Sequence, residues 1–271
     1  MSQSEQSPTT SVRSGDAPGK PATSTPDQLV YDLTRFTLAD MVGCGRALRS
    51  LVTESTSMED AAQKATRCFY EHCPDKISND RSCVLVRLFR THPYGGLSKE
   101  LRAVADSKAG GAALTPDTKC LTLLGTTGDD PKWNLRRSSE GHQCIPLLSV
   151  AMVEQFPMIS QLIHQFGLTT TELLRPTAEI IKDLGQKQFG VFHIPVAANS
   201  PFIPAQKEFV TPYGVASVLG FGGMLPDGDL FAAILFARVS IPASTAEMFR
   251  TIALNLKLGM LALLEKPVFA G

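Results

Sequence analysis

Cysteine and histidine are the residue types in this 271-residue chain that could bind a metal or act as nucleophiles. Cys68 and His72 are four residues apart in a segment with helical spacing, so both side chains could reach one ion. Cys73 follows, and His142 and Cys144 add two more candidate ligands. The repeated Cys-x-x-Cys pattern typical of zinc sites is absent. Buried structural cysteines are therefore the simpler interpretation, and we predict no metal.

A thiol-based activity is the second chemistry that these residues allow. Cys120 or Cys144 could pair with His142, because a neighbouring base activates a cysteine nucleophile. A reactive thiol needs an electropositive environment that the sequence does not show. Six cysteines in a chain of this size are not needed as a disulfide framework. We expect inert, reduced thiols and a cytoplasmic protein.

Haem is a third candidate. Cys73 precedes Pro74, and this dipeptide is similar to the Cys-Pro dipeptide of some haem-responsive proteins. The histidines that could serve as axial ligands are His92, His142 and His193. The pattern leaves the cofactor open between haem and another small ligand.

A further set of residues could contact a ligand without reacting with it. Arg87 interrupts an apolar strand-like run, so its charge either leaves the domain at an exposed edge, which we favour, or meets an anion inside. Trp133, the only tryptophan, lies in a polar loop and either covers a site or anchors the loop. His92, Tyr94 and His142 follow predicted strands, where the simpler interpretation is a hydrogen-bonded loop histidine.

A glycine-rich stretch surrounds Phe221, from Gly220 to Gly223. It lies inside a predicted strand, so it lacks the strand-to-helix context of a dinucleotide-binding loop. It favours a bulge or a close backbone approach, with a pocket wall as the alternative. The ligand-binding candidates are thus Arg87, His92, Tyr94, Trp133, His142, His193 and Phe221.

Composition excludes two classes of partner. The 26 Lys and Arg balance 26 Asp and Glu, which argues against a nucleic-acid footprint and against a polybasic membrane patch. No apolar run approaches the ~20 residues of a spanning helix, and we expect no secretory signal, because no early stretch joins a basic start to an apolar segment. The 43% hydrophobic content predicts an ordinary globular core.

The order of predicted elements indicates an α+β domain with an antiparallel central sheet flanked by helices. Residues 1–27 are rich in Ser, Thr and Pro and are expected to be disordered. The domain should span 28–266, followed by a tail at 267–271. Helices are predicted at 36–52, 57–73, 97–106, 152–166 and 180–184, with a helical turn at 205–210. Strands are predicted at 81–89, 119–124, 191–194, 215–225 and 229–239.

The last third ends in a long helix. Ser244 and Glu247 have the spacing of a capping box and predict a helix over 245–265. Its apolar residues recur at steps of three and four, which is typical of a coiled-coil seam. The residues expected in a dimer seam are Phe249, Ile252, Leu256, Gly259 and Leu263.

Together these segments resemble a GAF-like sensory domain, and more narrowly the N-terminal input region of bacterial sensor histidine kinases. The hairpin and the final helix carry the first resemblance. The segments similar to the input region are 84–94, 141–147, 191–195 and 217–223. The resemblance implies long N- and C-terminal helices that pack together, a homodimer and a bound small ligand. The 271 residues include neither the phosphoacceptor helix nor the ATP-binding domain of a histidine kinase. The resemblance therefore implies a stand-alone sensor that acts on a partner protein in trans, or part of a larger protein.

The sequence therefore predicts a regulatory domain that binds a small ligand and signals to a partner through the packing of dimer helices. Two alternatives stay open: a thiol-based enzyme on the same fold and a ligand-free adaptor.

Overall fold

The computed structural model describes residues 1, 30–75, 77–78, 80–165, 167–175, 177, 179 and 189–270. Apart from Met1, the N-terminal segment expected to be disordered lies outside the described residues. So does the helix expected at 180–184.

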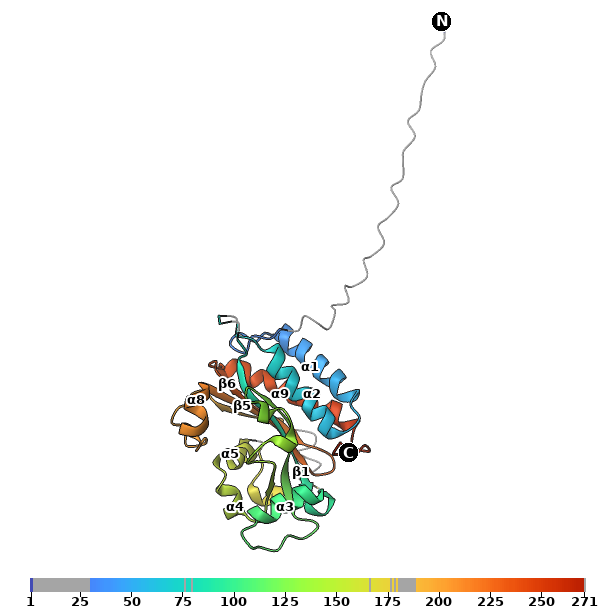
Figure 1. Cartoon of the computed structure of the whole chain (residues 1–271). Helices are drawn as coiled ribbons and strands as arrows, with labels where there is room; N and C mark the ends of the chain where they lie inside the picture. The colour runs from blue at the N-terminus through green and yellow to red at the C-terminus, as the bar shows by residue number, and fades with distance from the viewer. Residues whose placement is uncertain are drawn as a thin grey trace.

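Six antiparallel strands form a single sheet within the described residues, in the spatial order β3-β2-β1-β6-β5-β4 (Figure 1). The strands are β1 (Cys83–Pro93), β2 (Lys119–Gly128), β3 (Cys144–Pro146), β4 (Phe189–Ile194), β5 (Ser217–Met224) and β6 (Leu230–Ala237). Both faces of the sheet are covered, so β5 and β6 are buried along their whole length and read as continuous apolar runs. The predicted α+β class with an antiparallel sheet is confirmed; β3 was not predicted.

Three long helices cover one face of the sheet: α1 (Leu38–Thr53), α2 (Met58–His72) and α9 (Ala243–Leu261) (Figure 1). A capping box between Thr37 and Asp40 begins α1, and Ser57 caps α2 as predicted. The terminal helices α1 and α9 pack against each other, as the sequence led us to expect.

The capping box predicted for the last helix does not form. The helix begins at Ala243, so Ser244 is already inside its first turn, and Pro242 occupies the N-cap position without a side-chain hydrogen bond. Glu247 instead pairs with Arg250 at 2.7 Å.

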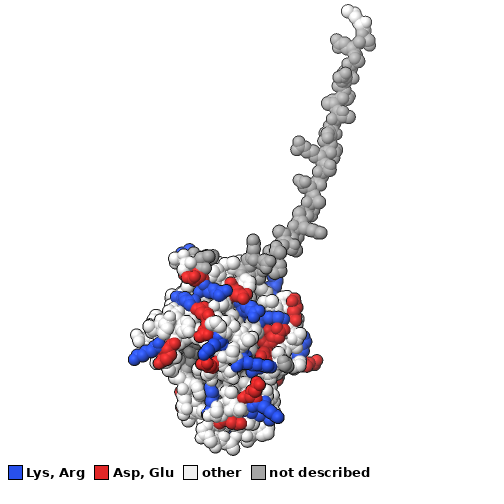
Figure 2. Space-filling model, in the orientation of Figure 1, with Lys and Arg blue, Asp and Glu red and all other residues white. Residues whose placement is uncertain are grey.

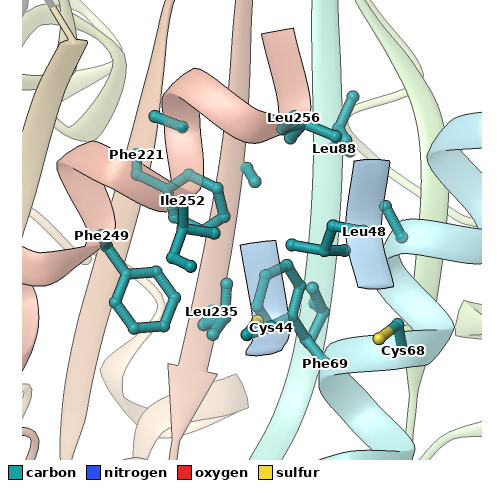
Figure 3. Packing of buried hydrophobic residues seen from close by; sticks show 14 of the residues in the cluster. Cys44, Leu48, Cys68, Phe69, Leu88, Phe221, Leu235, Phe249, Ile252 and Leu256 are labelled. Atoms are coloured by element: carbon teal, nitrogen blue, oxygen red, sulfur yellow. The ribbon is translucent and has the colours of Figure 1, made fainter. Parts of the chain in front are cut away.

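Aromatic rings fill the space between α9, α2 and the sheet (Figure 3). The ring of Phe249 lies 5.2 Å from that of Phe221 on β5 and 5.9 Å from that of Phe69 on α2, centroid to centroid. Phe36 lies 5.3 Å away on the other side. Phe221 is thus a core residue rather than part of a ligand site.

The predicted dimer seam is part of this core, which corrects that prediction. All five of its residues are buried in their own chain: Phe249, Ile252, Leu256, Gly259 and Leu263. A Cβ at Gly259 would lie 2.9 Å from the Cβ of Val52, so this glycine permits the contact with α1. Apolar residues that recur at steps of three and four indicate a buried helix face, and they do so equally whether a sheet or a second chain covers it. The large apolar residues of α9 that are exposed are Leu254 and Leu258.

Shorter elements complete the fold. They are α3 (Lys99–Lys108), α4 (Val150–Glu154), α5 (Pro157–Gln165), α6 (Thr170–Leu174), the π-helical turn Gln206–Val210 and α8 (Thr211–Tyr213), with 3₁₀ turns at Tyr94–Gly96, Pro131–Trp133 and Arg136–Ser138. The helix predicted at 152–166 is two helices, because Pro157 begins α5. A Cβ at Gly220 would lie 3.1 Å from Leu162 Cδ1, and the β5 pairings show no bulge. The close-approach interpretation of that glycine is confirmed.

The C-terminal residues pack on the start of α2 rather than extending as a tail. The amides of Met58 and Glu59 donate to the carbonyls of Pro267 and Val268, at 3.2 and 2.8 Å. These are amides of the first helical turn, which have no partner within the helix.

Charges of both signs are intermixed on the face seen in Figure 2, with no patch of one sign. Among the described residues, no helix combines the length and hydropathy that crossing a membrane requires.

Candidate ligand-binding cavity

A cavity of about 420 Å³ lies on the sheet face opposite α1, α2 and α9. This volume is within the range of pockets that enclose drug-sized ligands. Its floor is formed by β1, β2 and β6, including Leu85, Phe89 and Ile234. Its walls come from the α4–α5 region and from 202–209, and they are mostly apolar.

The alternation of side chains along β1 explains which residues reach the cavity. Leu85, Arg87 and Phe89 point to the cavity face, whereas Val86 and Leu88 belong to the core beneath the long helices. The same strand therefore contacts both the cavity and the helical layer.

Arg87 is the buried cation of this cavity. It is 9% exposed and lies on a central strand, paired with Thr126 of β2 and Ile234 of β6. Its Nη2 donates to Ser139 Oγ at 3.1 Å, and its Nε is buried without a hydrogen-bond partner. Burial lowers the pKa of the guanidinium to about 10, so Arg87 is charged at neutral pH. The exposed-edge interpretation of Arg87 is wrong, because β1 has a neighbour on each side.

A second polar atom without a partner lies next to Arg87. Thr126 is directly opposite Arg87 in the β1–β2 register, and its Oγ1 is buried without a hydrogen bond. Directly opposite residues have Cβ atoms about 4.5–5.5 Å apart on the same face of a sheet. Arg87 lines the cavity, whereas Thr126 is fully buried behind it and does not line it.

His142 and Glu140 lie at the rim of the cavity. His142 is an exposed residue, and partial desolvation of its imidazole, together with the positive charges of Arg87 and Lys108, lowers its pKa below the usual value. The imidazole is therefore neutral at pH 7 and adds no positive charge to the site. Glu140 is exposed, and its carboxylate pairs with Lys132 at 3.0 Å.

Trp133 both lines the cavity and anchors its loop. Its ring centroid lies 4.8 Å from that of Tyr213 and 5.6 Å from that of Phe209. This aromatic group joins the 131–133 turn to the segment 206–213 across the cavity. The two sequence-based interpretations of Trp133 describe the same arrangement.

Four predicted ligand residues lie away from this cavity. Tyr94 is half-buried against α3, with its hydroxyl donating to Asp106 at 2.9 Å. His92 has an edge-to-face contact with Phe269, and burial lowers its pKa. His193 Nε2 lies 2.9 Å from the Ile241 carbonyl oxygen, and Phe221 is in the core. The structure therefore brings together Arg87, Trp133 and His142 and separates them from the other candidates.

All six cysteines are buried free thiols. Cys120 and Cys144 pack with Leu101 and Ala105 of α3, outside the cavity. A hydrogen bond between these two thiols lowers the pKa of Cys144 and raises that of Cys120. No hydrogen bond in the described part of the chain joins either thiol to His142, so the structure does not show the thiolate–imidazole pair that the thiol-enzyme alternative requires.

The candidate metal ligands do not converge. Cys68 is in the core, and His72 Nδ1 lies 3.0 Å from the Cys68 carbonyl oxygen. Over the ranges that the structure describes, no group of three or more His, Cys, Asp or Glu side chains could hold an ion. Cys73 is buried in the same core, so the Cys-Pro dipeptide does not face the cavity.

Sequence reasoning missed most of the cavity wall. Phe156, Ile159, Phe202 and Phe209 come from segments between the strands and have no chemical signature. In the sequence these residues show only an apolar character in segments that flank strands. Residues of an ordinary hydrophobic core show the same pattern, so the sequence does not separate the two.

Comparison with known proteins adds little. No family model matches the sequence, and no curated protein matches it. The fold is similar to a solved structure, the phycoerythrobilin-bound GAF domain from a cyanobacterial phytochrome, with a TM-score of 0.35 and 9% sequence identity. The match covers 82% of this chain and 96% of that chain. A likeness of this extent says nothing about what this chain binds.

Proposed function

We propose that this chain is a regulatory domain of GAF-like architecture that binds a small ligand in the cavity whose floor includes β1 and β6. One observation carries the proposal: a cavity of about 420 Å³ with mostly apolar walls is lined by a few polar side chains, among them Arg87 and His142. That combination is the usual composition of small-molecule sites.

The position of the cavity suggests how a bound ligand would act. Arg87 and Leu85 of β1 contact the cavity, while Val86 and Leu88 of the same strand contact the helical layer. A ligand that favours one position of β1 would therefore also favour one packing of α1, α2 and α9. It can shift that equilibrium only by its difference in affinity for the two states.

Filling the cavity should abolish ligand binding. Ala232 is fully buried on the cavity floor, so Ala232→Phe places a ring in the space that the ligand would occupy. We expect saturable quenching of Trp133 fluorescence by 4-phenylbutanoate or 4-phenylbutanamide in the parent protein. We expect at least about tenfold weaker binding in the variant, because overpacking excludes the probe.

Two further proteins make this test specific. Tyr94→Phe changes a half-buried ring outside the cavity and should bind like the parent protein. Ala205→Phe fills the cavity from an exposed position and replaces Ala232→Phe if that variant unfolds. Binding that neither filled variant weakens, or no binding of either probe to the parent, would contradict the proposed function.

We also propose that the domain forms a homodimer through the outer surface of α1 and α9, and that this dimer passes the signal to a partner protein. Four apolar side chains are exposed there: Leu38 (68%), Val42 (63%), Leu254 (38%) and Leu258 (42%). A dimer that buried these four side chains would form through α1 and α9, which belong to the helical layer that packs against the cavity strands.

Leu258→Glu should shift the protein from dimer to monomer in sedimentation velocity, because a charge would be buried at the interface. Leu135→Glu is the matched control, since Leu135 is a 62% exposed leucine in a loop away from α1 and α9. A parent protein that sediments as a monomer at every concentration would exclude this dimer.

A further inference from the structure

We propose that the ligand of this cavity is an apolar molecule that ends in one carboxylate, which the Arg87 guanidinium binds. This inference rests on the proposed function of the cavity and names the class of ligand.

The three buried arginines of the described chain support it by comparison. Arg136, 6% exposed, pairs with both carboxylate oxygens of Glu59, at 2.9 and 3.2 Å. Arg90, 4% exposed, pairs with Asp227 and with Asp229. Arg87 is the buried arginine for which the described residues provide a hydroxyl, that of Ser139, and no carboxylate.

A buried charge is stable only when it is paired, because removing it from water is costly. At Arg136 and Arg90 the chain provides the pairing carboxylates itself. At Arg87 the guanidinium instead reaches a cavity that is open to a small molecule. An anionic ligand would complete the third pair.

The geometry at Arg87 favours a carboxylate. One donor of the planar guanidinium is taken by Ser139, and the buried Nε–H has no acceptor. A carboxylate can accept two parallel hydrogen bonds from a guanidinium edge.

The rest of the cavity limits the ligand to one charge and an apolar body. His142 is neutral at pH 7, so it does not balance a second negative charge. Glu140, at the rim, already pairs with Lys132. Aromatic and aliphatic side chains form the walls, including Phe156, Ile159 and Phe202. These side chains match a hydrocarbon or aromatic group and not a hydrated polyanion.

The test compares two probes that differ in charge and little in shape: 4-phenylbutanoate and 4-phenylbutanamide. Binding is measured by Trp133 fluorescence and by calorimetry, at pH 7 and one fixed salt concentration. The parent protein should bind the carboxylate about 10- to 100-fold more tightly than the amide, as expected for hydrogen bonds to a charged group. Arg87→Met should bind the two probes equally, with the affinity of the parent for the amide.

Arg102→Met is the matched control, because Arg102 lies over the ring of Tyr94 and outside the cavity. It should retain the preference for the carboxylate. If Arg87→Met does not fold, Arg87→Gln makes the same comparison while keeping a polar side chain.

The outcomes separate the two proposals. Equal affinity of the parent for both probes would overturn the carboxylate inference and leave the cavity as a ligand site. A preference for the carboxylate that persists in Arg87→Met would also overturn it, since another group would then bind the anion. Failure of both probes to bind would overturn the proposed function, and the carboxylate inference with it.

Discussion

Asp229→Ala should lower the free energy of unfolding by about 3 kcal/mol, because it removes the buried carboxylate that Arg90, Lys119 and Thr91 share. Asp229 is 7% exposed and is the acceptor for three side chains. Lys119 Nζ donates to its Oδ1 at 2.9 Å, Thr91 Oγ1 donates to the same oxygen at 3.0 Å, and Arg90 Nη2 donates to Oδ2 at 3.1 Å. The loss falls at the lower end of the usual range for buried pairs, because Asp227 still pairs with Arg90.

Chemical denaturation measures this change directly, and a thermal melt should show a fall of about 2–4 °C for each kcal/mol. Glu247→Ala is the control, since Glu247 forms an exposed pair with Arg250 and should cost less than about 1 kcal/mol. Equal stability losses in the two variants would show that the Asp229 cluster does not stabilise the fold.

Phe249→Ala should destabilise the protein by about 3–5 kcal/mol, the usual cost of removing a buried phenyl group. Its ring contacts Phe36, Phe69 and Phe221, and it is completely buried. This substitution also separates the two interpretations of the residue. A core residue lowers the melting temperature equally at low and high protein concentration, whereas a seam residue alters mainly the association of the chains.

Leu258→Ala serves as the matched variant on the same helix, because Leu258 is 42% exposed. Measured at a protein concentration low enough for the monomer, it should change stability by less than about 1 kcal/mol. If Phe249→Ala changes only the dimer equilibrium, then this part of α9 is an interface and our description of the core is wrong.

The local features of the fold could be predicted because their causes are local. Ser57 caps α2, and Pro226 to Gly228 turn the chain between β5 and β6, through contacts among residues close in sequence. The α+β class followed from the order of these elements. The strand β3 was not visible, because three residues are too few to show an alternating pattern.

The partners of a buried face could not be predicted, because periodicity shows that a face is covered and not by what. The repeat through Phe249 and Leu256 fits a second helix and a sheet equally well. Likewise, a charge in an apolar strand leaves open whether the strand is at an edge. Arg87 is internal because β2 and β6 both pair with β1, which depends on contacts distant in sequence.

The most direct test of a carboxylate ligand at Arg87 is a crystal structure of the protein grown with 4-(4-bromophenyl)butanoate. The anomalous signal of bromine locates the probe without any assumption about its position. The account predicts bromine among the apolar walls of the cavity and the carboxylate within hydrogen-bonding distance of Arg87. A bromine peak outside the cavity, or a bound probe whose carboxylate points away from Arg87, would contradict it.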